Sequence, residues 1–166
     1  GTTGMPKGVM YAIGGLTAGL GSSAFPLLGL PTPTEAQQIV DAAVSTEGAM
    51  VSLPCAPLMH GTGLWLGCFI PHLLGSEVIT LTNRSLDSHE VLDTIERRGA
   101  TSVTIVGDSF AKPLIAAIDE ARPDGTPYDL SSVAIMQSSG VMWTSEVKQQ
   151  LIERIEQVML IDAMGS

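Results

Sequence analysis

The sequence predicts an α/β fold, in which residues 1–166 form a single subdomain with a mostly parallel sheet and helices on both faces. From residue 50 onward, short apolar runs alternate with stretches that have the apolar period of a helix. The apolar runs are nearly continuous, which is typical of strands buried on both faces. Hydrophobic residues make up 45% of the chain and aromatic residues only 4%, so Ala, Val, Ile and Leu should build the core.

The chain is expected to have two parts. Residues 1–49 form an irregular, partly helical lead-in that begins with a Gly-Thr loop over residues 1–8, and residues 50–166 form the alternating sheet. In the lead-in only residues 34–44 are predicted as a regular helix. The expected strands are residues 50–57, 77–81, 101–106, 132–136 and 158–161.

The helices between these strands are predicted from caps and apolar faces. Ser85 or Asp87 can cap a helix that runs to Arg98 and stops at Gly99. Asp108 and Thr144 are the expected caps of the two later helices. A helix with a break at its proline is expected to follow the first strand. The predicted helices of this region are residues 61–74, 85–98, 109–121 and 144–157.

The carboxyl ends of parallel strands share one edge of a sheet, and ligands of such folds bind there. Several of these ends are rich in Gly and Ser, which lets a ligand approach the backbone closely. The sequence therefore predicts a binding site along this edge. The expected strand ends are residues 57–63, 82–84, 107–109, 138–140 and 162–166.

Composition excludes several classes of protein. A formal charge of −9 disfavours nucleic-acid binding, because such a surface repels a phosphate backbone. Cys55 and Cys68 form no CxxC and no metal-ligand spacing with histidine, which fits a reducing cytoplasm. Residues 8–34 lack charge, but their Gly and Pro content argues against a membrane span.

The chain opens with GTTGMPKG at residues 1–8, a possible anion-binding loop. It is not a Walker A motif, because Pro6 precedes Lys7 and no Ser or Thr follows. Glycine backbone N–H groups, threonine hydroxyls and a lysine can nevertheless cradle a pyrophosphate. On chemistry alone, a Gly-rich turn with a solvated lysine is an equal alternative.

The string GTTGMPKGV resembles the signature of the adenylate-forming enzymes. Three further segments resemble that family in the expected order: PLMHGTG at 57–63, SSGVM at 138–142 and DAMGS at 162–166. They are similar to the PLFHxxG, SGGAP and NxYGxTE segments of acyl-CoA synthetases. The resemblance implies the central part of a longer enzyme, within its large N-terminal domain. The strings VMY and TIVGDSFAKPLI look like the actinobacterial branch that handles fatty and steroid side-chain acids.

The resemblance also implies roles for single residues. Lys7 and His60 are the expected catalytic residues, and His60 with Gly63 would border the acyl group. Met164 stands where the family has a tyrosine that stacks on adenine, which weakens or alters that contact. From the residues alone, His60 could instead be an ordinary loop histidine. The implied nucleotide-binding residues are Thr2, Thr3, Gly4, Ser139, Gly140, Asp162, Met164 and Gly165.

The implied reaction is ligation of a fatty or sterol side-chain acid to CoA, driven by ATP with Mg²⁺, in the cytoplasm. The metal's protein ligand is expected beyond Ser166, with none in this chain, and the chain alone is expected to be inactive. An alternative is an NADP-dependent oxidoreductase, because GTGLWLG at 61–67 nearly matches a dinucleotide fingerprint and Arg84 could meet a 2′-phosphate. A non-catalytic nucleotide-binding or interaction domain is the other alternative.

Overall fold

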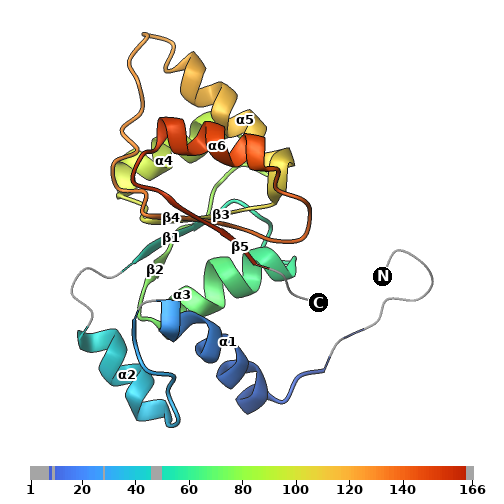
Figure 1. Ribbon diagram of the computed structural model, residues 1–166, viewed down its shortest axis with the longest axis vertical. Helices are drawn as coiled ribbons and strands as arrows, with labels where there is room; N and C mark the ends of the chain where they lie inside the picture. Colours follow the sequence, from blue (N-terminus) through green and yellow to red (C-terminus); the bar gives the residue numbers. More distant parts are fainter. Residues whose placement is uncertain (1–7, 9, 28, 46–49, 164–166) are drawn as a thin grey trace.

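A computed structural model describes residues 8, 10–27, 29–45 and 50–163 (Figure 1). It contains a five-stranded sheet with the order β2-β1-β3-β4-β5, and every neighbouring pair is parallel. The predicted parallel α/β fold is therefore confirmed. The strands are β1 (Val51–Pro54), β2 (Glu77–Val78), β3 (Ser102–Ile105), β4 (Ile135–Ser138) and β5 (Met159–Asp162).

Helices cover both faces of this sheet, as the sequence predicts. Figure 1 shows α4, α5 and α6 together on one side of the strands, with α1 and α3 on the other. The π-helix η1 contacts β1 and β3 and continues directly into α3. The helices are α1 (Ile13–Leu27), α2 (Ala36–Ser45), η1 (Thr62–Phe69), α3 (Ile70–Leu73), α4 (Ser88–Arg98), α5 (Gly107–Glu120) and α6 (Ser145–Arg154).

The two faces of the sheet differ in chemistry. Leu53, Val103 and Met136 are buried in the main apolar core, which they share with residues of α4, α5 and α6. Toward η1 the side chains are polar: the Ser52 hydroxyl donates to the Gly67 carbonyl at 2.9 Å, and the Gln137 amide donates to the Leu66 carbonyl at 3.0 Å. The expectation of nearly continuous apolar strands is therefore wrong for this face, where hydrogen bonds attach the helix.

Helix η1 lies against β1 and the segment that follows it, because two glycines let it approach. A Cβ at Gly67 would lie 2.5 Å from the Pro54 Cβ, and one at Gly63 would lie 2.5 Å from the carbonyl oxygens of Ala56 and Pro57. Both distances are too short for any side chain. The predicted helix over 61–74 is confirmed in place, but most of it has the wider π pattern, in which the Ile70 N–H bonds to the Trp65 carbonyl.

The predicted caps are mostly confirmed. Asp87 accepts from the N–H groups of His89 and Glu90 at the start of α4, and Gly99 ends that helix at φ +62°. Thr144 caps α6 by accepting from the Val147 N–H at 3.4 Å. The fourth strand lies further along than predicted, because the Val133 N–H bonds to the Leu130 carbonyl in a turn before β4 begins.

Helix α1 was not predicted as a regular element. It has no charged residue, four glycines and Pro26, so neither propensity nor amphipathic pattern marks it. Its Ala24 and Phe25 are buried with Leu74 in a second, smaller apolar cluster. Within the described residues, no helix is long and apolar enough to cross a bilayer.

Candidate active site

The strand-end segments of β1 and β4 meet, as the sequence predicts. Gly140 follows β4, and a Cβ placed on it would lie 3.5 Å from the His60 Cε1 and 3.6 Å from the Thr62 Oγ1. Gly140 has φ +96°, a backbone conformation that L-residues rarely adopt. Two segments about eighty residues apart are thus brought into contact at the carboxyl edge of the sheet.

His60 lies in the turn between β1 and η1. Its own N–H donates to the Pro57 carbonyl at 2.9 Å, and its carbonyl accepts from the Leu64 N–H at 2.9 Å. The Thr62 N–H donates to the ring Nδ1 at 3.2 Å. Because Nδ1 accepts this bond, a neutral ring carries its proton on Nε2, where it can donate to a ligand. His60 is exposed at the edge of the sheet, in the place predicted for it.

A second part of the site is an open pocket of about 490 Å³ at the ends of β4 and β5. It brings together three residues predicted to bind the nucleotide, Ser139, Gly140 and Asp162. Ser138 supports the wall from beneath: its hydroxyl accepts from the Gly107 N–H at 2.7 Å, and its carbonyl accepts from the Ala163 N–H at 2.8 Å.

The structure gives Asp162 a partner that the sequence did not reveal. Its carboxylate forms an ion pair with Lys148 of α6, and the Lys148 ammonium lies 5.4 Å from the centre of the Trp143 ring. Trp143 is buried and forms part of the pocket wall. In the sequence, the only pointer to Lys148 is the Thr144 cap, because it places Lys148 in the first turn of α6. The charge of Asp162 is therefore balanced within the fold.

Asp108 has a different role from the one predicted. Helix α5 already begins at Gly107, so Asp108 lies inside its first turn and does not cap it. Its carboxylate instead accepts from the N–H and hydroxyl of Thr144, at 2.9 Å and 3.0 Å, and pairs with Lys112 at 3.3 Å. These contacts lower the pKa of Asp108, chiefly through the Thr144 N–H. Asp108 thus links α5 to the loop between β4 and α6, which lines the pocket.

The remaining predicted residues divide into two groups. Gly63 is buried against the backbone of Ala56 and Pro57, which is a packing contact, so its substrate role stays a prediction. The other predicted residues lie outside the part that the structure describes. They are Thr2, Thr3, Gly4, Lys7, Met164 and Gly165.

A parallel sheet with helices on both faces and a Gly- and Ser-rich site at its strand ends defines a class of α/β nucleotide-binding domains. The sequence pattern of one family, the AMP-binding enzymes, matches residues 1–166. The chain therefore belongs to the AMP-binding enzyme family, as its motifs predicted. This assignment removes the oxidoreductase alternative. Two glycines of its supposed fingerprint have packing contacts: Gly67 with Pro54 of β1, and Gly63 with Ala56 and Pro57, which follow that strand.

Relatives of known activity match the chain along its whole length. The medium-chain acyl-CoA ligase Mig of Mycobacterium avium is 35% identical over 169 residues. The 3-oxocholest-4-en-26-oate–CoA ligase of Rhodococcus rhodochrous is 30% identical over 171 residues. Each alignment covers 100% of this chain but only 29% of the relative. The chain thus spans less than a third of these enzymes.

Solved structures share the fold. A long-chain-fatty-acid–CoA ligase from Archaeoglobus fulgidus superposes with a TM-score of 0.59 at 12% identity, covering 79% of this chain and 26% of that one. The anthranilate–CoA ligase AuaEII, solved with anthranoyl-AMP, gives a TM-score of 0.58 at 21% identity, covering 79% and 25%. At these identities the likeness supports the fold.

Proposed function

We propose that this chain forms part of an ATP-dependent carboxylic acid–CoA ligase that works through an acyl-adenylate. The observation that carries the proposal is the contact between the His60 segment and the Gly140 loop, beside the pocket that holds Ser139 and Asp162. In a member of the AMP-binding family, this contact places the groups expected around an acyl chain next to those expected around a nucleotide.

The proposed reaction has two steps. A carboxylate oxygen attacks the α-phosphorus of ATP, pyrophosphate leaves, and an acyl-adenylate forms. The sulfur of CoA then attacks the acyl carbon, AMP leaves with the bonding electron pair, and the thiol proton passes to solvent. Because a carboxylate is a weak nucleophile, the protein contributes mainly by positioning the reactants and stabilising charge.

The residues of this chain would divide that work. The nucleotide would lie against the backbone of Ser139 and Gly140, whose side chains are small. One carboxylate oxygen of Asp162 pairs with Lys148, and the other can accept a hydrogen bond from the exocyclic amino group of the base. His60, with its Nε2 as a donor, would orient the acyl group. Lys7 with Thr2, Thr3 and Gly4 would bind the phosphates.

The acid proposed as substrate is a fatty acid or a sterol side-chain acid. An apolar groove of about 410 Å³ runs beside η1 and α1, with Leu16, Leu20 and Trp65 among its walls. The Tyr11 ring meets the Trp65 ring edge-on, with 5.7 Å between their centres. Such a surface suits an uncharged hydrocarbon. The names of the two bacterial relatives, which specify medium-chain acyl and cholestenoate substrates, support this class.

The ion that would accompany ATP has no evident site among the described residues. Within the described ranges, no group of three or more His, Cys, Asp or Glu side chains could hold a metal. The proposal therefore uses no protein-bound Mg²⁺ in any step.

Carboxylate-dependent exchange of pyrophosphate into ATP tests the proposal in the intact protein that carries this chain. We expect exchange with at least one acid from a panel of fatty, aromatic and sterol acids. His60→Ala should lower kcat/KM about tenfold to a hundredfold, because it removes a positioning group from an exposed place without disturbing the core.

His72→Ala is the matched control, because His72 is also exposed and lies in α3, away from the sheet edge. It should leave kcat/KM unchanged. Absence of exchange with every acid, in a protein that is folded and binds ATP, would reject the ligase and favour a non-catalytic nucleotide-binding domain.

A further inference from the structure

The positive charges of the structure are almost all paired. Seven lysine and arginine side chains lie in the described part of the chain, and six of them form ion pairs with carboxylates. The exception is Arg84, whose side chain has no ion-pair or hydrogen-bond partner within the described part of the chain. The chain has a formal charge of −9, which repels anions in general. Within the described structure, the unpaired guanidinium of Arg84 is therefore the group best able to attract one.

The two carboxylates nearest to Arg84 in sequence are occupied elsewhere. Glu90 accepts from the Thr82 N–H at 2.8 Å and hydroxyl at 2.5 Å, and these bonds lower its pKa. Asp87 accepts from the Asn83 amide at 3.2 Å while it caps α4. Both acids thus hold the loop that carries Arg84 and leave its guanidinium unpaired. These bonds hold the loop on both sides of Arg84, whose side chain is exposed.

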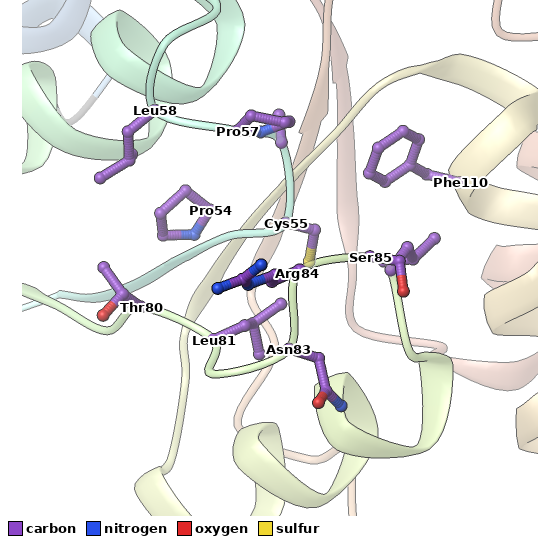
Figure 2. A pocket seen from close by; sticks show the side chains of 12 residues that line it. Pro54, Cys55, Pro57, Leu58, Thr80, Leu81, Asn83, Arg84, Ser85 and Phe110 are labelled. Atoms are coloured by element: carbon purple, nitrogen blue, oxygen red, sulfur yellow. The ribbon is translucent and has the colours of Figure 1, made fainter.

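Arg84 reaches across an open pocket of about 450 Å³ between the β2–α4 loop and the segment that follows β1 (Figure 2). The walls include the apolar side chains of Pro54, Leu81 and Phe110, and none of the described residues that line the pocket is acidic. Burial raises the pKa of the Cys55 thiol to about 12, so this wall also carries no negative charge. The pocket thus joins a single cation to an apolar surface.

We propose that the Arg84 pocket binds the oxyanion of an amphipathic ligand, with Arg84 as its charged contact. The pocket extends from Arg84 to Leu58, two residues before His60. A ligand held by Arg84 can therefore reach His60 along residues 54–58, which end and follow β1. The ligand's identity rests on the proposed function. The oxyanion is then either a phosphate of CoA or the distal carboxylate of a dicarboxylic acid, and both suit a guanidinium.

Calorimetric binding tests the proposal on the intact protein without ATP, where no turnover occurs. The probes are CoA, 3′-dephospho-CoA, a long-chain dicarboxylic acid and the monocarboxylic acid of equal length. Arg84→Gln should weaken CoA or the diacid about tenfold, as loss of one charge-assisted contact predicts. Arg84→Lys should restore part of the affinity, because it keeps the charge without the planar fork.

Arg97→Gln is the control, because it makes the same charge change on the exposed face of α4, where Arg97 pairs with Asp93. It should bind all four probes as the parent does. Loss confined to CoA identifies its 3′-phosphate, equal loss with dephospho-CoA identifies the diphosphate, and loss confined to the diacid identifies the carboxylate. Binding of CoA and the diacid unchanged by Arg84→Gln, or absent in the parent at millimolar concentration, overturns the proposal.

The readout separates this proposal from the ligase proposal. Pyrophosphate exchange uses no CoA, so a protein that exchanges normally but binds every probe independently of Arg84 rejects only the Arg84 pocket. A protein that shows no exchange but loses CoA or diacid affinity in Arg84→Gln rejects only the ligase.

Discussion

Gly140 lies where the His60 segment and the end of β4 meet. Its backbone has φ +96°, which favours glycine, and a Cβ at this position would lie in ordinary van der Waals contact with the His60 ring, at 3.5 Å. A side chain here would strain the backbone of the loop that lies beside His60.

Gly140→Ala should destabilise the fold by about 1–2 kcal/mol and also impair adenylate formation. Gly125→Ala is the matched variant, because Gly125 has φ +82° but open space around it, far from the sheet edge in the loop after α5. Urea unfolding should give similar losses for the two variants, and pyrophosphate exchange should fall only in Gly140→Ala. An equal fall in both would contradict a specific role for Gly140.

Single residues were predictable where a local pattern carried the information. His60, Ser139, Gly140 and Asp162 follow predicted strands, and parallel strands must end at one edge, so their approach followed from the fold class. The role of Lys148 did not, because its ion pair with Asp162 depends on how α6 crosses the sheet. For the same reason Asp108 was assigned to its own helix, whereas it bonds to Thr144 thirty-six residues later.

Among the elements, η1 depends most on a few small residues. Gly67→Ala would force a methyl group into the Pro54 Cβ, and overpacking of this kind costs about 1–3 kcal/mol. Gly19→Ala in α1 meets no described atom within 4 Å and should stabilise that helix by about 0.5–1 kcal/mol. The free energy of unfolding, measured with urea, should therefore move in opposite directions. Destabilisation by Gly19→Ala, or none by Gly67→Ala, would contradict this packing.

The elements were predicted in the right order, with errors that have physical causes. Strands and amphipathic helices after residue 50 have periods that a sequence shows directly. Helix α1 has no charged polar face, so its sequence shows no amphipathic pattern. It is stabilised by tertiary packing, in which Ala24 and Phe25 are buried with Leu74. The π pattern of η1 was equally hidden. Its carbonyls accept hydrogen bonds from Ser52 and Gln137 of the sheet, and such contacts between distant segments depend on the fold.

Across the whole molecule, the helices on one face of the sheet are joined by ion pairs. Arg122 pairs with Glu96 of α4 at 2.7 Å, and Arg154 of α6 pairs with Asp119 of α5 at 2.7 Å. Hydrogen bonds from the two arginines lower the pKa values of Glu96 and Asp119. A carboxyl group whose pKa is lower in the folded state stabilises the fold above its unfolded pKa, and this contribution is lost as pH falls through the folded value.

Stability should therefore decline in acid, below the ordinary pKa values of 4.5 for Glu96 and 3.8 for Asp119. Asp119→Asn should be less stable than the parent at pH 7 and should lose less on acidification, so that the two urea midpoints converge as pH falls below the ordinary pKa of Asp119. Arg154→Gln should behave alike, and the double variant should add little, because both changes break one pair. Parallel pH curves for parent and Asp119→Asn would refute this coupling.

Because η1 is a π-helix, the number of residues between His60 and α3 also affects the geometry of the site. Its wider turns take up more residues between His60 and α3 than an α-helix of the same height would. Deleting one residue from this segment would keep every residue type that the site uses. It would nevertheless change the direction of His60 around the helix axis relative to Gly67, which packs against Pro54 of β1. Among natural variants of this segment, substitutions should therefore be tolerated far more often than insertions or deletions.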